Sequence, residues 1–279
     1  MGTKCRNCGR DAKLSTHYND QHILKCDRCG GFQFMGQLGD LAGLYTEDYY
    51  NGAEYINYGL GAPVYRRNFV RKLKEIRKCV PELQYKDMRV LEIGSATGDF
   101  MQVLRDHGVE FMLGVEASEY SRERSQERGF EILNPFAADY LTRVQEFAPN
   151  VICAWDVWEH LEYPAEVFDT LIDQNPSVQV ISLSTVDSGA LVPRVKGKRW
   201  RQYHPPTHLN YPTRKSFDLY LEGVGFQVMS NRAFGYYRPL ADYLSLFIKT
   251  ETLNSLPWLF KIPLHLNLFD IQLLVARRA

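Results

Sequence analysis

The stretch that decides the fold is Arg89-Val-Leu-Glu-Ile-Gly-Ser-Ala-Thr-Gly-Asp99. Its first five residues form a short apolar run, typical of a buried strand, and Asp99 begins an amphipathic pattern that continues through His107. Between the two, Gly94 and Gly98 allow the backbone to approach a ligand closely. The sequence therefore predicts a strand, a glycine turn and a helix, arranged as a cradle for a nucleotide.

Strand and helix patterns alternate on both sides of this unit. Apolar runs that predict further strands lie at residues 111–116, 151–156, 178–185, 226–230 and 269–277, and the segments between them have helical spacing or turn residues. Alternation of this kind is typical of an α/β domain built on a largely parallel sheet.

The glycine turn differs from that of a dinucleotide site, which would read GxGxxG. Leu91-Glu-Ile-Gly-Ser-Ala-Thr-Gly98 instead resembles the first motif of the class I S-adenosylmethionine (SAM)-dependent methyltransferases, usually ExGxGxG, with Ala96 replacing the middle glycine. The resemblance covers roughly residues 86–230. It implies a Rossmann-like, seven-stranded methyltransferase sheet whose last strand is antiparallel.

The same resemblance assigns the cofactor site. Glu116 ends the second strand 22 residues after Gly94, and it should accept hydrogen bonds from both ribose hydroxyls, since a carboxylate has two acceptor oxygens that match a vicinal diol. Phe136 and Asp139 would contact the adenine, although Asp139 could instead cap a helix. The full set of expected SAM-binding residues is Glu92, Gly94, Ser95, Gly98, Phe100, Glu116, Ala117, Asp139 and Asp156.

The fourth strand runs into Asp156-Val-Trp-Glu-His-Leu-Glu-Tyr-Pro164. This resembles the D-x-x-E-H-x-x-x-P motif of a group that includes ubiquinone-type O-methyltransferases and many sugar and natural-product enzymes. In that group the strand end lies beside the methionine part of SAM and opens on the substrate. We expect His160 to act as the base, because histidine titrates near neutral pH; the alternative is that it shapes the pocket wall.

A second polar cluster follows the fifth strand, at residues 198–211. It resembles the P-x-H-L-x-Y-F segment of relatives with an N-terminal zinc knuckle, which implies a substrate lid with His208 and Tyr203 as further catalytic candidates. Both could instead be structural. The basic run Lys196, Lys198, Arg199 and Arg201 could hold a diphosphate or could face solvent.

Four N-terminal cysteines form two CxxC pairs, Cys5/Cys8 and Cys26/Cys29, each followed by glycine. Two such hairpins can place four thiolates tetrahedrally around one zinc ion. Four thiolates leave no open coordination position, so we predict a structural Zn²⁺ in a small zinc ribbon; a redox dithiol is the alternative.

The chain should therefore have three parts: a zinc knuckle at 1–36, a connecting region at 37–85, and a SAM-binding domain at 86–279 with substrate-lid insertions at about 186–212 and 233–265. The connecting region carries five tyrosines, Tyr45, Tyr49, Tyr50, Tyr55 and Tyr58, which could cover the pocket or only tether the knuckle. After it, Pro63 should open a helix that extends to Val80. The basic face of this helix should be solvated, or could bind an anion.

The charge composition of the chain narrows the class of molecule that could accept the methyl group. Lys+Arg and Asp+Glu are equal at 33 each, whereas proteins that grip nucleic acid usually carry a basic excess. The leading hypothesis is methyl transfer at O, N or C of a small molecule, such as a nucleotide-linked sugar or a natural-product or polysaccharide intermediate, possibly phosphorylated. The alternatives are a zinc-ribbon RNA methyltransferase and a SAM-binding protein without catalysis. We expect a cytoplasmic protein without a membrane partner, able to form a homodimer.

Overall fold

The computed structural model describes residues 3–37 and 57–279. Its centre is a seven-stranded sheet in the order β12-β15-β10-β9-β6-β7-β8. Only β15 runs antiparallel to its neighbours β10 and β12, as predicted for the last strand. The strands are β6 (Arg89–Ile93), β7 (Phe111–Val115), β8 (Ile132–Leu133), β9 (Val151–Trp155), β10 (Val180–Val186), β12 (Phe226–Ala233) and β15 (Ile271–Arg278).

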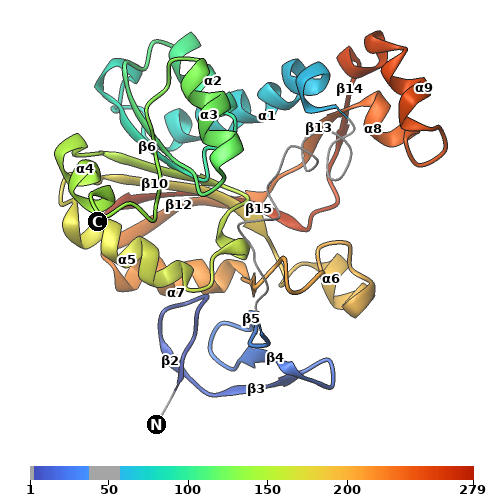
Figure 1. The fold of residues 1–279 in the computed structure, drawn as a ribbon. Coiled ribbons are helices and arrows are strands. Elements are labelled where there is room, and N and C mark those ends of the chain that lie inside the picture. Colours follow the sequence, from blue (N-terminus) through green and yellow to red (C-terminus); the bar gives the residue numbers. More distant parts are fainter. Residues whose placement is uncertain (1–2, 38–56) are drawn as a thin grey trace.

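Helices cover both faces of this sheet (Figure 1). One face carries α1 (Tyr58–Cys79), α2 (Asp99–Asp106) and α3 (Glu119–Glu127), and the other carries α5 (Pro164–Gln174) and α7 (Arg214–Gly223), with α4 (Tyr140–Phe147) near the β8 edge. Each face has its own apolar core, with Leu73 and Phe100 in the first and Phe168 and Phe217 in the second. The predicted Rossmann-like α/β fold is confirmed.

Side-chain caps mark the starts of two helices of the sheet domain. Ser118 accepts a hydrogen bond from Ser121 N at the start of α3, and Thr213 forms a reciprocal capping box with Ser216 at the start of α7. The predicted start of α1 is wrong. This helix begins at Tyr58, because Asn57 caps it, and Pro63 lies inside it.

The solvated basic face predicted for α1 is also wrong at one position. Lys72 is only 1% exposed, although Arg67, Lys74 and Lys78 on the same helix are exposed. Lys72 lies next to the core residue Leu73 and points toward the carboxyl end of β9, where its ammonium group meets Asp156. Burial of this cation is possible because a carboxylate from another element pairs with it.

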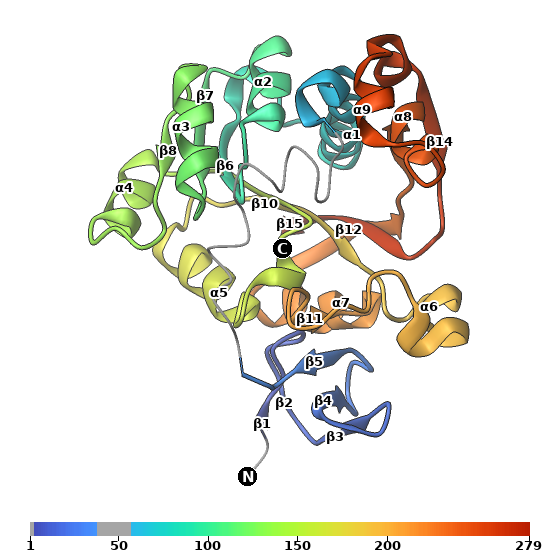
Figure 2. The same cartoon turned by 45° about the vertical axis from the view of Figure 1, so that its right-hand side comes forward.

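The two insertions form separate structures at the carboxyl edge of the sheet. The first contains α6 (Leu191–Lys196), η5 (Gly197–Arg199) and β11 (Asn210–Tyr211). The second contains the expected helices, α8 (Leu240–Leu244), α9 (Thr250–Asn254) and η6 (Pro257–Lys261), and two antiparallel strands that the sequence analysis did not predict, β13 (Tyr236–Pro239) and β14 (Pro263–Leu266). It packs against α1 (Figure 2).

The N-terminal part, which we call the cysteine module (residues 3–37), contains β1 (Thr3–Lys4), β2 (Asp11–Ala12), β3 (Leu14–His17), β4 (Asp20–Cys26) and β5 (Phe32–Phe34). Its larger sheet has a fourth strand from far along the chain, because β11 pairs with β5 in the register Phe32↔Tyr211. The module is therefore joined to the first insertion by backbone hydrogen bonds. The tyrosines at 45, 49, 50 and 55 lie outside the described residues.

Candidate active site

The strand β6 is preceded by η3 (Tyr85–Asp87) and followed by the glycine turn. The backbone of this turn is tightly constrained. Gly94 has φ +71°, and a Cβ added there would lie 2.4 Å from Val157 Cγ2, so only glycine fits without a shift. The backbone N–H groups of Gly94 and Ser95 both donate to the carbonyl of Val115, at 2.8 and 3.1 Å. Ala96 also has a positive φ, +45°, which explains why the resembling motif has glycine at this position.

Glu116 faces this turn with its carboxylate held from two sides. Oε2 accepts from Ala96 N and Oε1 accepts from Ser118 N, both at 2.8 Å. Each oxygen keeps a second acceptor position. Burial raises the pKa of Glu116, and the backbone donors oppose that rise. The carboxylate is therefore fixed next to the turn with acceptor capacity to spare, as a ribose diol requires. Ala117 follows it directly, at the end of β7.

Two polar groups beneath the turn have no partner. Glu92 is 3% exposed, and its Oε2 makes no hydrogen bond within the described chain; the same holds for the hydroxyl of buried Ser95. Burial raises the pKa of Glu92 well above its ordinary value, and the nearby Lys72 opposes this. Buried polar atoms without partners are rare and costly. Their position under the glycine turn fits a site that a polar ligand completes.

The expected adenine side is more open. Phe136 is 76% exposed, and Asp139 is exposed with an ion pair of 3.9 Å to Arg143. Asp139 occupies the N-cap position of α4 without making a side-chain capping bond. Phe100, by contrast, is buried among Trp155 and Phe69, with ring centroids 5.1 and 5.8 Å away. Phe100 would therefore meet a cofactor only through its backbone.

Asp156 follows β9 in a left-handed conformation (φ +58°) and forms the centre of a charged network. The Tyr236 hydroxyl lies 2.7 Å from both carboxylate oxygens, the Ser184 hydroxyl donates at 3.0 Å, and Lys72 Nζ lies 3.5 Å away. Sequence reasoning missed Lys72 and Tyr236. Lys72 was assigned to a solvated face, and Tyr236 lies in the second insertion, where one aromatic among many gives no signal.

Two histidines meet where η4 (Trp158–His160) faces the first insertion. His160 and His208 have ring centroids 4.7 Å apart, and their Nδ1 atoms lie 3.0 and 2.9 Å from the carbonyls of Thr207 and Gln202. A carbonyl only accepts, so Nδ1 carries the proton in each ring and Nε2 is the basic nitrogen. Burial lowers the pKa of His160 to about 4 and of His208 to about 2, so both rings are neutral at neutral pH.

Glu159 lies under this histidine pair. It is 2% exposed and accepts from the Thr185 hydroxyl at 2.7 Å. Burial, and then the charge of Asp156, raise its pKa to about 8. Potential ligand atoms of Glu159, His160 and His208 all lie within 4.8 Å of one another. A carboxyl group and two neutral imidazoles thus converge at the carboxyl edge of the sheet.

Tyr203 is placed differently from the histidines. It belongs to an aromatic wall with Tyr18, Phe32 and Tyr211, at centroid distances of 5.3, 6.4 and 5.8 Å. This wall joins the cysteine module to the first insertion.

The basic run contains two paired and two exposed cations. Lys198 pairs with Asp20 at 3.5 Å and Arg201 pairs with buried Asp270 at 3.1 Å, while Lys196 and Arg199 are exposed.

The four N-terminal cysteines come together as predicted. All four are buried, their sulfur atoms lie within 4.8 Å of one another, and Cys5 Sγ and Cys29 Sγ are 3.9 Å apart. Tetrahedral Zn²⁺ with bonds of about 2.3 Å requires sulfurs about 3.8 Å apart. Gly9 and Gly30 have φ of +63° and +76°, and their N–H groups close the turns onto the carbonyls of Cys5 and Cys26. The donor set and its spacing fit zinc.

Comparison with known proteins agrees with this geometry. The sequence pattern of a family described as a methyltransferase domain matches residues 65–231, more than half of the chain. The chain belongs to this methyltransferase family. No curated protein matches its sequence.

Solved structures similar to this methyltransferase share its fold at low sequence identity. A chain in a Haloferax volcanii complex that contains the Trm112 methyltransferase activator has a TM-score of 0.53 and 11% identity, over 87% of this chain and 99% of that one. A SAM-dependent methyltransferase from Archaeoglobus fulgidus has a TM-score of 0.49 and 18% identity, over 76% and 94%. Among the described residues of the methyltransferase, no helix has the length and apolarity needed to cross a membrane.

Proposed function

We propose that this methyltransferase acts on a small-molecule acceptor, of the nucleotide-linked sugar or biosynthetic-intermediate class. The observation that carries the proposal is the pair of neutral imidazoles, His160 and His208, at the carboxyl edge of the sheet beside Asp156. A buried, aromatic-walled site of this kind suits a small acceptor with a proton to lose. The insertions at 186–212 and 233–265 serve as its lid.

The cofactor half of the site uses the residues around the glycine turn. Glu116 holds the ribose hydroxyls, and the backbone at Gly94, Ser95 and Gly98 approaches the cofactor closely. Glu92 and Ser95 supply buried polar atoms beneath it. Phe100 and Ala117 border the site through their backbones, and Asp139 lies at the adenine end. Asp156 orients the methionine end of the cofactor. Lys72 and Tyr236 hold the carboxylate of Asp156 in place.

When bound, SAM would supply an electrophilic sulfonium methyl group, and its transfer to the acceptor atom would leave S-adenosylhomocysteine. The protein aligns that atom and removes its proton. Nε2 of His208 or His160 accepts the proton, because Nδ1 of each ring is already committed to a backbone carbonyl. Tyr203 lines the acceptor side from the aromatic wall. The cysteines hold a structural zinc, which keeps the module folded and takes no part in the chemistry.

An RNA acceptor has less support. Besides Lys72, which pairs with Asp156, three other cations of α1 are engaged within the protein. Arg66 binds Asp99, Arg71 donates to the Gly235 carbonyl, and Arg77 donates to the Leu83 carbonyl. The formal net charge of the chain is zero, so the chain as a whole has no basic excess for an RNA backbone.

The test combines cofactor binding with turnover. Glu116→Ala should weaken SAM binding in calorimetry by about tenfold or more, since it removes both ribose acceptors. His208→Ala should lower kcat by about 100-fold, because a general base usually contributes a factor of this size. Turnover is measured with labelled SAM on a panel of nucleotide-linked sugars. SAM affinity should change less than about twofold in His208→Ala.

His22→Ala, an exposed histidine on β4, is the matched control and should retain full turnover. Full turnover in both His208→Ala and His160→Ala would remove these residues as bases. Tight SAM binding without methyl transfer to any acceptor, RNA included, would favour the non-catalytic alternative.

A further inference from the structure

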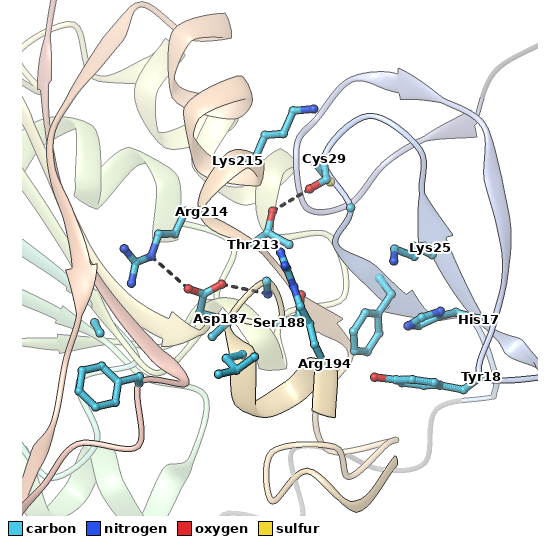
Figure 3. A pocket seen from close by; sticks show the side chains of 17 residues that line it. His17, Tyr18, Lys25, Cys29, Asp187, Ser188, Arg194, Thr213, Arg214 and Lys215 are labelled. Carbon is cyan, nitrogen blue, oxygen red and sulfur yellow. Dashed lines mark hydrogen bonds and ion pairs between the residues drawn. The ribbon is translucent and has the colours of Figure 1, made fainter. Parts of the chain in front are cut away.

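A hollow lies between the cysteine module and the carboxyl edge of the sheet. Its volume is about 800 Å³. His17, Tyr18 and Lys25 line it from the module, and Asp187 and Arg214 line it from the sheet side (Figure 3). It is separate from the glycine turn, none of whose residues line it.

Positive charge dominates the lining. Four cations border the hollow, Lys25, Arg194, Arg214 and Lys215, against one acid, Asp187. Arg214 pairs with Asp187 at 3.1 Å. Within residues 3–37 and 57–279, the other three cations form no ion pair. A protein of zero net charge thus concentrates four cations against one acid around one cavity, where their shared field favours an anion.

The backbone adds to this field. The hollow is bordered by Thr213, Arg214 and Lys215, the N-cap and first residues of the ten-residue helix α7. The capping box already satisfies the N–H group of Ser216, and the helix dipole places positive potential at this end of α7. Figure 3 shows Arg194 between this helix start and the module, so its guanidinium adds N–H donors to the same space.

The hollow lies a short distance along β10 from Asp156 of the proposed methyl-transfer site. Asp187 comes three residues after Ser184, whose hydroxyl binds Asp156. At a rise of about 3.3 Å per strand residue, the two ends lie about 10 Å apart along β10. Phe32 and Tyr18 border the hollow and pack on Tyr203 and Tyr211 of the aromatic wall. A diphosphate linking a nucleoside to a sugar covers a distance of this order.

We propose that the hollow binds the phosphate or diphosphate group of the acceptor, with Lys25, Arg194 and Lys215 as its cationic ligands. This inference rests on the proposed small-molecule function and narrows its acceptor to phosphorylated or nucleotide-linked compounds. The basic run at 196–201 is less suited to a diphosphate, because two of its four cations are paired with Asp20 and Asp270. The rings of His17 and Tyr18 would contact an attached nucleoside.

The test is direct binding of inorganic pyrophosphate and of UDP to the full, zinc-loaded chain by calorimetry in 150 mM salt. The double variant Lys25→Ala/Arg194→Ala should lose at least about tenfold in affinity for both probes, because each anion loses two charge-assisted contacts. The matched control is Lys13→Ala/Arg199→Ala, which removes two exposed cations outside the hollow and should bind as the unmodified chain does.

Three results would overturn the proposal: no binding of either probe by the unmodified chain, equal binding by both double variants, or RNA binding through the same cations with affinity that falls steeply with salt. Tighter binding of UDP than of pyrophosphate would support a nucleotide-linked acceptor over a simple phosphate ester. SAM affinity is measured on the same samples. Intact SAM binding without probe binding contradicts only this hollow, whereas loss of SAM binding contradicts the proposed function.

Discussion

At Glu159, the surroundings of one buried carboxyl group determine its protonation state. Its carboxyl is almost fully buried, accepts one hydroxyl hydrogen bond from Thr185, and shares its surroundings with the carboxylate of Asp156. Both burial and the neighbouring charge disfavour ionisation, and its pKa rises to about 8. The group is therefore protonated at neutral pH, next to two imidazoles whose pKa values are lowered by burial.

The pKa of Glu159 predicts a pH dependence of stability. A carboxyl whose folded pKa lies above its unfolded value stabilises the fold fully below the unfolded pKa, near 4.3, and loses that contribution as pH rises through about 8. Between pH 6 and 8 the unmodified chain should lose about 2 kcal/mol from this group. Glu159→Gln, which stays neutral, should lack this loss, so its stability relative to the unmodified chain should rise by about 2 kcal/mol between pH 6 and 8 in urea unfolding.

Exposed Glu166 on α5 gives the matched control, because Glu166→Gln should leave the slope unchanged. Parallel profiles for Glu159→Gln and the unmodified chain would contradict a raised pKa at Glu159.

At the scale of the element, α1 separates what a sequence pattern can predict from what it cannot. Helical spacing of apolar residues predicted the helix at 64–80, but the first turns from Tyr58 depend on a cap at Asn57 that the apolar pattern does not register. Likewise, Lys72 was assigned to solvent because its partner Asp156 is distant in sequence. Periodicity reports which face is buried, and only the tertiary structure reports which charge is neutralised there.

Lys72 should be essential to the packing of α1. It is the cation that faces the carboxyls of Glu92, Asp156 and Glu159, and it lies against the rings of Trp155 and Tyr236. Lys72→Met keeps the volume and removes the charge, so it should lower the free energy of unfolding by about 3 kcal/mol, as for other buried pairs that lose one partner. Guanidinium unfolding measures the change.

A double-variant cycle isolates the pair. Lys72→Met/Asp156→Asn should recover part of the loss, since it removes both charges together. Exposed Lys74→Met is the control and should change stability by less than about 0.5 kcal/mol. A cycle without coupling would show that Lys72 and Asp156 stabilise the fold independently.

At the scale of the whole molecule, the sequence predicted the parts better than their attachment. The order of strands, the cysteine cluster and the two insertions follow from local patterns and from the resemblance. The docking of the module does not, because it depends on β5 pairing with β11 and on Thr213 Oγ1 donating to the Cys29 carbonyl. These contacts join segments about 180 residues apart, and two-residue β11 has no strand signal of its own.

This attachment predicts a selective effect of zinc removal. The module is too small to hold its fold by apolar burial alone, so chelation or Cys26→Ser should unfold it and release β11 with it. His208 lies two residues before β11 and bonds to the same loop, at the Gln202 carbonyl, so its position should be lost as well. The glycine turn and Glu116 lie in the loops that follow β6 and β7, and within the described part of the chain neither strand pairs with the module.

Cys26→Ser should therefore lower turnover by about 100-fold, the loss expected for a displaced base, while SAM affinity changes less than about twofold. Hydrogen exchange should rise at residues 203–211 and stay unchanged at 89–99, because only the first segment depends on the module. Cys79→Ser, a half-buried cysteine on α1 outside the cluster, should leave all three readouts unchanged. If Cys26→Ser instead abolished SAM binding together with turnover, the module would stabilise the whole domain rather than the acceptor side, and the division of the site into a cofactor half and a module-supported acceptor half would be wrong.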